Sequence, residues 1–514
     1  MKNTLRILSL LLVVLMIGAL LAACGKNKDK DGTGENTPPP VANDDPYADE
    51  LPAELDYGGA TVTILSSQKD TVKVEFYAEG DSANAIESAV FKRNETVKER
   101  LNVGLYILLD DASKDVTNIE KRIESTVTAG DTTFDVAVGP TYRMTANVNN
   151  GHFRNLKNCT YMNLNKYYWS QGFNSALSYG NDKQYIANGS IVLSIYRCLD
   201  CTIFNKTMFG DKQETNLYEV VRNGEWTMEY QLNVSKRLAT GTANPDSAIY
   251  GMAAGLKVSV DPYWVSLNAP LVNKDANNHF QYAATNRTAS NKIITACKAI
   301  LDLYSDASCF VAPNANDSFS NVDNNYAHMM FCDKRAAMST TVIYNIERTT
   351  QQLGDIDYGI VPMPMLDKNQ GAYYTGVQDQ VSALGIINTV TDDRLQMVGA
   401  VLECLASESY KTVVEEYYEN IMQYRFAQDV DTQEMLTIIY EGSCMPLTGI
   451  YTGVLNENIG SGVTTFLRNI IEVGVSSGGQ NPASTQLSTI KNTMPKNVET
   501  LNKAFEDLEP KKEA

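Results

Sequence analysis

The side chains best suited to acid–base or metal chemistry are few and scattered in this sequence. Three histidines stand far apart, so neither a histidine-based triad nor a zinc site finds its parts: His152, His279 and His328. Adjacent carboxylates include Asp110-Asp111, Asp392-Asp393 and Glu415-Glu416. We interpret these as solvated charges; an exported glycoside hydrolase or lyase acting on surface polysaccharide stays as the alternative. The expectation is a protein that is not an enzyme and needs no cofactor or metal.

Aromatic side chains among polar residues form the stronger chemical signal. They fall in segments typical of loops: Tyr142, Tyr167-Tyr168-Trp169, Tyr263-Trp264, Tyr344 and Tyr373-Tyr374. A sugar presents C–H groups on its ring faces and hydroxyls around its edge. Flat Tyr and Trp rings cover the former, and planar Asn, Gln, Asp and Arg groups satisfy the latter. The pattern indicates sugar binding, while the alternative that these rings only pack long loops against the body stays open.

The N-terminal segment predicts export and lipid anchoring. Lys2 and Arg6 border an apolar stretch over 7–20, a pattern typical of a secretory signal and too short for a dependable transmembrane span. The next residues, Leu21-Ala-Ala-Cys24-Gly25, resemble a bacterial lipobox, which implies a signal peptide over 1–23 and a diacylglyceryl group on Cys24. Acyl chains such as palmitate would then hold the protein at the extracytoplasmic face of the cell membrane. An ordinary signal peptide with an incidental cysteine is the alternative.

The mature chain is acidic and begins with a tether. Residues 24–56 are polar and include three consecutive prolines, so they bury too little apolar surface to fold. The chain has 43 basic and 61 acidic residues, and removal of the signal peptide takes two basic residues, which leaves a net charge near −20. This charge argues against a nucleic-acid partner and against adhesion to anionic lipid head groups. We expect a monomer.

The cysteines other than Cys24 do not form a disulfide framework. They are scattered along a chain that is long enough to build its own core. Cys198-Leu-Asp-Cys201 is a lone C-x-x-C within a strand-like run over 193–204. A redox pair or half of a metal site is the alternative to buried, incidental thiols, but no second pair stands at zinc spacing.

The body of the chain alternates strands and helices. Strands are predicted at 61–65, 103–109 and 134–138, and helices at 82–101, starting from a Ser82 cap, and at 116–127. Further strands are predicted at 184–188, 193–204, 249–253, 335–342, 358–364 and 381–387, and a helix at 289–304. The C-terminal part is predicted to be nearly all helix: 391–407, 409–424, 432–441, 464–473 and 483–508. This order predicts an α/β fold with mainly parallel sheets flanked by helices and with ligand-binding loops at the carboxyl ends of strands.

Several short motifs follow one another along this alternation. They are Phe91-Lys-Arg-Asn94 with Val97 to Val103, Phe134-Asp-Val136, Thr202 to Lys206, Gly224-Glu-Trp-Thr227, Tyr250-Gly251, Phe331 to Met338 and Asp357 to Pro364. In this order they resemble extracellular solute-binding proteins of the maltodextrin-binding type, which serve bacterial ABC importers. Lys334 departs from the resemblance, because a glycine is usual at that turn.

The resemblance implies a two-lobed periplasmic-binding-protein-like fold of type II. Lobe I would comprise 57–190 plus 333–389, and lobe II 191–332 plus 390–510. Crossing strands near 190–196 and 330–335 would form much of the hinge. The implied function is capture of a solute, a mono- or oligosaccharide, in the interlobe cleft and its delivery to the permease subunits of an ABC importer.

The cleft should be lined by loops that follow strand ends and by the crossing segments. Trp264 should supply the main stacking face, opposed by Tyr142 or Trp169, and Gln378 and Asp379 should bind hydroxyls. The full set of ligand-binding candidates is Tyr142, Trp169, Tyr196, Tyr263, Trp264, Gln378 and Asp379.

Overall fold

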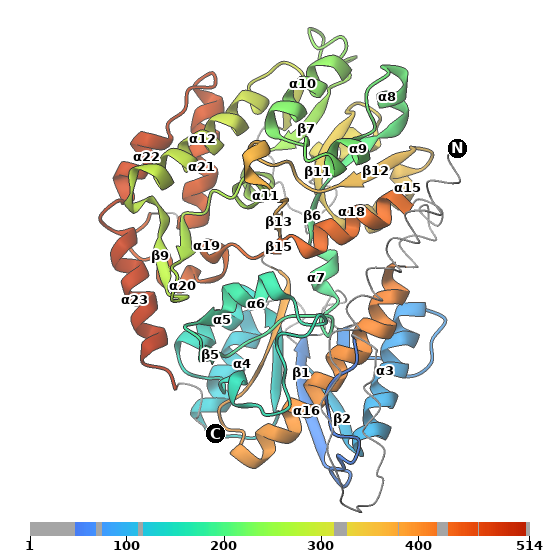
Figure 1. Ribbon diagram of the computed structural model, residues 1–514, viewed down its shortest axis with the longest axis vertical. Helices are drawn as coiled ribbons and strands as arrows, with labels where there is room; N and C mark the ends of the chain where they lie inside the picture. The colour runs from blue at the N-terminus through green and yellow to red at the C-terminus, as the bar shows by residue number, and fades with distance from the viewer. Residues whose placement is uncertain are drawn as a thin grey trace, which may run out of the picture. The chain divides into compact units, whose positions relative to one another are not determined.

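Two β-sheets organise this computed structural model, with helices packed around them (Figure 1). The structure describes residues 47–67, 75–110, 117–312, 326–378, 380–418, 430–460 and 462–509. The expected signal peptide, Cys24 and most of the tether lie outside the described residues, and so does Asp379.

The first sheet has the strand order β14-β3-β1-β2. β1 (Thr61–Ser67) lies parallel to β2 (Gly104–Asp110) and to β3 (Val136–Pro140). β14 (Ser382–Ile386) arrives from far along the chain and runs antiparallel to β3, with Ser382 opposite Pro140. All residues of β3 and β14 are buried. β3 is an inner strand, and β14, the edge strand, is bridged by Ala187 at Leu384.

The helices of this sheet begin close to where the sequence predicts them. α3 (Ala85–Leu101) and α4 (Thr117–Thr128) connect the first strands. The cap of α3 is Asn84 and not Ser82, because the Asn84 side chain accepts hydrogen bonds from the backbone N–H groups of Ile86 and Glu87. Ser82 lies two residues earlier and accepts from the Asn84 backbone.

The second sheet has the strand order β10-β7-β11-β6-β12 and mixes directions. β7 (Met252–Gly255) is parallel to β10 (Cys309–Ala312) and β11 (Met338–Val342). β6 (Asp200–Asn205) runs antiparallel to β11 and to β12 (Tyr358–Val361). The expectation of mainly parallel strands therefore holds for the first sheet and is wrong for the second, where β6 reverses direction between two strands.

The division of the chain between the sheets differs from the predicted lobes. β11 and β12, expected in lobe I, belong to the second sheet because they pair with β6. α16 (Asp392–Glu408), expected in lobe II, packs on α3, and Arg394 at its start holds Asp135 beside the first sheet. Both differences arise from pairings between residues far apart in sequence, which local patterns do not specify.

The chain crosses between the sheets at 187–199 and again at 362–381. The first crossing was predicted, but residues 194–197 form the short helix α7 (Ser194–Arg197) instead of a strand. The crossing predicted near 330–335 is wrong, since α13 (Tyr326–Cys332) contacts β7 and β11 of the same sheet. A β-bridge between Leu199 and Val377 joins the two crossing segments side by side.

Lys334 adopts the backbone conformation for which a glycine is usual at this turn. Its φ is +58°, and its backbone N–H donates to the Phe331 carbonyl. A lysine therefore adopts the left-handed conformation there, at a cost that the closed turn offsets.

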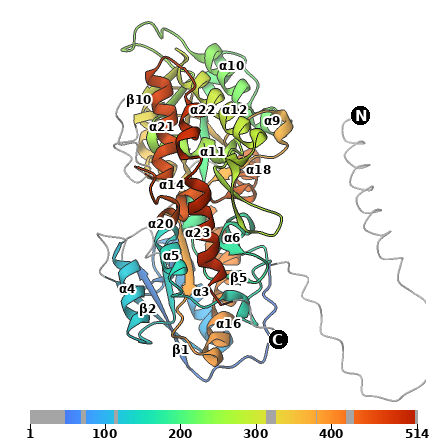
Figure 2. The same ribbon diagram turned by 90° about the vertical axis from the view of Figure 1, so that its left-hand side faces the viewer.

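The C-terminal region is helical, with interruptions. After α16, its longer described helices are α18 (Val430–Glu441), α21 (Val463–Ser476), α22 (Ala483–Ile490) and α23 (Met494–Glu506), and residues 409–414 form a π-helix. The predicted single helix over 483–508 is two helices, because residues 491–493 form a turn. Figures 1 and 2 both place α21 to α23 along one side of the sheets.

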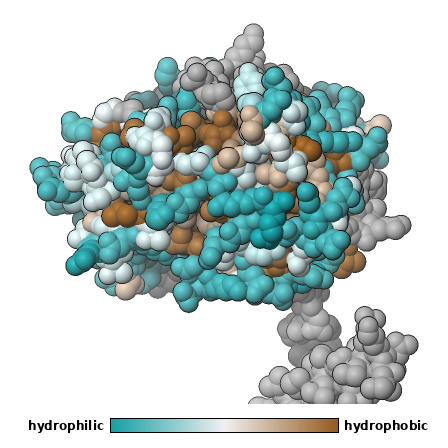
Figure 3. All heavy atoms as spheres, turned by 90° about the horizontal axis from the view of Figure 1, so that it is seen from above, coloured by the Kyte–Doolittle hydropathy of each residue, from teal (hydrophilic) through white to brown (hydrophobic). Residues whose placement is uncertain are grey.

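The surface seen at the end that carries α10 (Met228–Leu238) is dominated by hydrophilic side chains, with apolar side chains showing between them (Figure 3). No helix within the described residues has both the length and the apolar character needed to cross a membrane.

Candidate functional site

The strand ends that lead into the crossing segments and loops define where a ligand site can form. In the first sheet, β1 ends at Ser67 and β3 ends at Pro140. In the second sheet Asp200 begins β6 opposite Val342, where β11 ends. Because loops leave the sheets at these points, they are free to carry binding side chains without disturbing the ladders.

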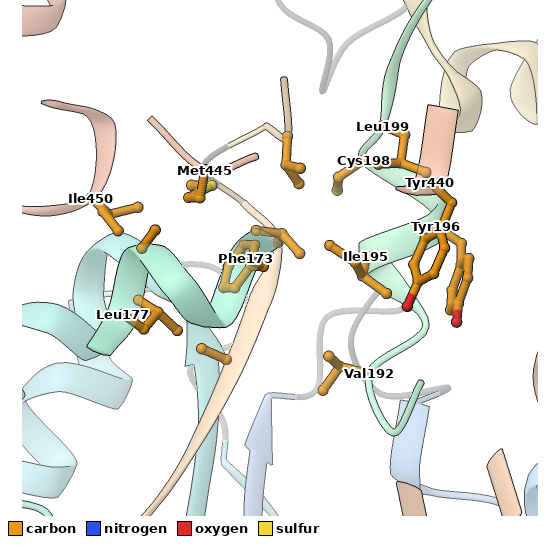
Figure 4. Packing of buried hydrophobic residues seen from close by; sticks show 14 of the residues in the cluster. Phe173, Leu177, Val192, Ile195, Tyr196, Cys198, Leu199, Tyr440, Met445 and Ile450 are labelled. Carbon is orange, nitrogen blue, oxygen red and sulfur yellow. The ribbon is translucent and has the colours of Figure 1, made fainter. Parts of the chain in front are cut away.

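The crossing segments themselves are packed by an apolar cluster. Figure 4 shows Ile195, Tyr196 and Leu199 from the first crossing beside Tyr440 of α18, with Phe173 of α6 (Gln171–Leu177) and Met445 nearby. These side chains are buried. The cluster therefore packs the crossing segments against α6 and α18.

One hollow joins the second crossing to the second sheet and contains two of the predicted residues. We name it the Trp264 hollow; the residues that define it are Asp200, Asp261, Trp264, Gln378, Thr448 and Arg468. They come from β6, α11 (Asp261–Ser266), the second crossing, α19 (Leu447–Ile450) and α21. The hollow has a volume of about 100 Å³ and is partly open.

Trp264 lines this hollow because of its place on α11. Asp261-Pro262 begins the helix, which suits proline since a first-turn N–H needs no helical partner. The Trp264 side chain is 5% exposed, and its indole N–H has no hydrogen-bond partner among the described residues. A buried donor without a hydrogen-bond partner destabilises the folded protein. A ligand atom that accepts a hydrogen bond from this indole N–H would therefore bind favourably.

Tyr263, the neighbouring candidate, points elsewhere. Successive residues on a helix differ in direction by about 100°, and Tyr263 is fully buried against Tyr304, with which its ring makes an edge contact. Its hydroxyl lies 3.2 Å from that of Thr340. Burial also raises the pKa of Tyr263 well above its usual value. In this structure Tyr263 supports the second sheet and does not line the hollow.

Asp200 is the most unusual polar group of the hollow. It is 4% exposed, and its Oδ1 atom has no hydrogen-bond partner among the described residues. Burial, and then the nearby charge of Asp261, raise the pKa of Asp200 well above its usual value. This shift favours the neutral carboxylic acid form of Asp200, which can donate as well as accept. A Cβ on Gly376 would clash with its Oδ2 atom, so glycine allows the crossing strand to approach.

Asp261 and Arg468 form the charged wall of the hollow. Nε of Arg468 lies 3.0 Å from Oδ1 and 3.1 Å from Oδ2 of Asp261, and Nη2 also donates to Oδ2. This arrangement links α21 to the first turn of α11 in a bidentate geometry. It fixes the carboxylate beside Trp264.

Gln378 reaches the hollow from the second crossing. Its backbone N–H donates to the Cys198 carbonyl at 3.0 Å, and the adjacent Val377 bridges to Leu199. The two crossings thus hold Gln378 in place. Asp379, the next candidate, cannot be placed because it lies outside the described residues.

The remaining candidates do not line the Trp264 hollow. Trp169 is fully buried, and its indole N–H donates to Glu403 at 2.9 Å. Tyr142 is half-buried under the Arg143 guanidinium, which lies 4.9 Å from its ring centre. Tyr196 lines a separate tyrosine hollow, where its ring stacks 4.7 Å from that of Tyr440.

A third hollow lies beside Arg197, the last residue of α7. Nε and Nη2 of Arg197 donate to Glu347 at 3.2 and 3.0 Å, and the guanidinium covers the Tyr344 ring at 4.4 Å. Tyr417 donates to the other oxygen of Glu347. Because this network satisfies its own polar groups, we regard the hollow as a weaker candidate site than the Trp264 hollow.

The histidines do not assemble into a catalytic or metal site within the described residues. His328 is buried beside the Thr349 hydroxyl at 2.8 Å, and burial lowers its pKa to about 4. His152 is hydrogen-bonded to Asn147. No cluster of three or more metal-ligating side chains occurs in the part of the chain that the structure describes.

Sequence reasoning missed Asp200 and Arg468. Asp200 stands between two cysteines in an apolar run, and a charged residue at the first position of a buried strand is itself a signal. Arg468 lies in an amphipathic helix, and the sequence around it does not distinguish it from a solvent-exposed arginine.

Comparisons with known proteins bear on the fold. No protein-family model matches the chain, and neither does any curated protein. Among solved structures, a cyclo/maltodextrin-binding protein complexed with maltotetraose has a TM-score of 0.54 at 11% identity, over 86% of this chain and 97% of that chain. An ABC substrate-binding protein from Listeria monocytogenes in complex with cycloalternan has a TM-score of 0.51 at 11% identity, over 86% and 99%.

A sugar transporter from Rhizobium etli in an open conformation is similar to the same degree, with a TM-score of 0.52 at 12% identity over 88% of this chain and 100% of that chain. These likenesses show the fold. The chain has the two-lobed, α/β, type II periplasmic-binding-protein fold that the sequence predicted.

Proposed function

We propose that this protein captures a solute, a mono- or oligosaccharide, in the Trp264 hollow and delivers it to the permease subunits of an ABC importer. One observation carries the proposal: Trp264 and Asp200 line the same hollow, and each has a buried polar atom, the indole nitrogen and Oδ1, without a partner within the described residues. A sugar would supply hydroxyls to both atoms and a ring face to the indole.

The fold supports the same function. The proteins of similar fold include one complexed with maltotetraose and one complexed with cycloalternan. They are described as binding proteins and not as enzymes. At the identities found, they support a class of function and do not identify a ligand.

Binding without turnover is the expected activity. Asp200 and Asp261 could suggest the two carboxylates of a glycosidase. However, Arg468 holds both oxygens of Asp261, which reduces its capacity to act as a nucleophile. Release of free sugar from oligosaccharides during incubation with the protein would favour the hydrolase alternative.

The binding test combines a thermal-shift screen with calorimetry. A ligand that binds the folded state raises the unfolding temperature by mass action. We expect a shift with at least one saccharide, and a loss of affinity in Trp264→Phe and Gln378→Ala. Gln351→Ala, at an exposed helical position, is the control and should bind as the wild type does. Unaltered affinity in both hollow variants would place the ligand elsewhere.

We also propose that the mature protein is a lipoprotein anchored through Cys24, on the support of the lipobox resemblance and the polar tether that follows. Cells labelled with palmitate should incorporate label into the wild type. Cys24→Ala should remain unlabelled and lose its membrane partition in detergent extraction. Labelled Cys24→Ala protein would contradict the anchor.

A further inference from the structure

One ionisable group of the Trp264 hollow, Asp200, has no oppositely charged partner among the described residues that line it. Among the described residues that line it, the charged side chains are Asp200, Asp261 and Arg468. Arg468 binds both oxygens of Asp261 and so compensates that carboxylate. Asp200 is the remaining ionisable group, and both influences on it, burial and the charge of Asp261, oppose its ionisation.

The position of Asp200 suits a ligand cation. Asp200 lines the hollow and is 4% exposed, and its Oδ1 atom has no partner among the described residues. The neighbouring Cys201 adds no charge, since burial and then Asp200 raise the pKa of its thiol well above the usual value. A neutral hydroxyl would satisfy one hydrogen bond, whereas an ammonium group would also stabilise the carboxylate form against Asp261.

Two further features favour a positive ligand group. Trp264 lines the same hollow, and indole is the aromatic side chain that attracts cations most strongly. The chain as a whole carries a formal charge of −18, so its field attracts cations and raises their association rate.

We infer that the captured solute carries a protonated amino group, as an amino sugar does, and that Asp200 selects it. The inference rests on the proposed function and specifies its ligand class. On binding, the Asp200 carboxyl group loses its proton to solvent, and the ligand nitrogen keeps its protons. The resulting carboxylate and ammonium then pair beside the Trp264 ring.

The test compares sugars that differ at one carbon. Glucosamine, N-acetylglucosamine and glucose, with their β-1,4-linked disaccharides, present an ammonium, an amide and a hydroxyl at carbon 2. Calorimetry near neutral pH should show that the wild type binds the ammonium member at least about tenfold more tightly than the other two. Measurements in buffers of different ionisation enthalpy should show proton release for that member.

Asp200→Asn is the decisive variant. It keeps the shape of the side chain and removes its charge, so it should bind the three sugars with similar affinity and release no proton. Asp246→Asn, the same change at an exposed position, should retain the wild-type preference. Cooperative thermal unfolding of Asp200→Asn at the wild-type temperature or above establishes that the variant is folded.

The outcomes separate the two proposals. Binding of neutral sugars by the wild type without preference for the amine, or a preference that Asp200→Asn retains, overturns the role of Asp200 and leaves sugar capture intact. Absence of binding across a broad saccharide panel overturns the proposed function together with this inference.

Discussion

The Arg468 guanidinium in α21 clasps the Asp261 carboxylate at the first turn of α11, with Nε 3.0 Å from Oδ1 and 3.1 Å from Oδ2. The two residues are 207 positions apart in the sequence. Their side chains are 22% and 32% exposed, so water screens the pair only in part. Both residues line the hollow that Trp264 also lines.

Removing this clasp should weaken the fold modestly. Arg468→Leu should lower the free energy of unfolding by about 1 kcal/mol, because a partly exposed ion pair contributes little beyond that amount. Arg468→Lys keeps the charge but loses the bidentate geometry and should fall between the two. Urea unfolding at low and at high ionic strength measures the effect, which should shrink in salt. A double-mutant cycle with Asp261→Asn that gives no coupling energy would show that the pair is not formed in solution.

Gly376 should tolerate no side chain. A Cβ there would clash with Oδ2 of Asp200, so Gly376→Ala should displace that carboxyl group and destabilise the protein by about 1–3 kcal/mol. Gly453→Ala is the matched control, because Gly453 lies in the short helix α20 (Thr452–Leu455) with open space around it. That variant should gain roughly 0.5–1 kcal/mol. Equal stability of the two variants by denaturant unfolding would remove the close approach of the crossing strand.

Glu403 should be essential for the packing of the first lobe. Its carboxylate accepts hydrogen bonds from the Tyr168 hydroxyl, the Trp169 indole and the Asn163 backbone. Glu403→Leu leaves these donors unpaired in the interior and should cost roughly 3–5 kcal/mol of unfolding free energy. Glu403→Gln retains one acceptor and should cost less than half as much. Tryptophan fluorescence during urea unfolding measures both, and similar losses in the two variants would contradict the role of the acceptors.

Glu75 should make stability depend on pH. It is fully buried and accepts a hydrogen bond from the Ser194 backbone at 2.8 Å, at the start of α7. Burial raises its pKa from 4.5 to about 7, although hydrogen bonds from Ser194 and Ser382 and the charge of Arg197 act in the opposite direction.

The sign of this effect follows from proton binding. Between about pH 4.5 and 7 the folded state keeps a proton that the unfolded state has released, so stability falls as pH rises through this window, by about 3 kcal/mol in total. Glu75→Gln cannot titrate and should lack this decline. Glu79→Gln, at an exposed position, is the control for the same change. Thermal unfolding across the window measures the curves, and a decline of the same size in Glu75→Gln would assign it to other groups.

The local elements of the first sheet follow from the sequence. The strands at 61–67, 104–110 and 136–140 and the helices between them lie within a few residues of their predicted bounds. Their signal is local: short apolar β-branched runs and helical spacing of apolar residues determine the type of each element. The sequence also singled out Trp264 and Gln378, from a turn and from a strand end, and both line one hollow in the structure. Their role in ligand binding stays a prediction.

The tertiary structure alone decided how those elements combine. Which sheet β11 and β12 join, where the chain returns to β14, and whether α16 packs on the first sheet depend on long-range pairings. Likewise, Trp169 and Tyr263 are aromatic residues in the same kind of local sequence as Trp264. In the structure they are buried, and they form hydrogen bonds with Glu403 and Thr340. The role proposed for Asp200 depends on Asp261 and Gly376, which the fold brings close to its carboxyl group. Burial and partners are properties of the assembled chain, so residue type and spacing cannot assign them.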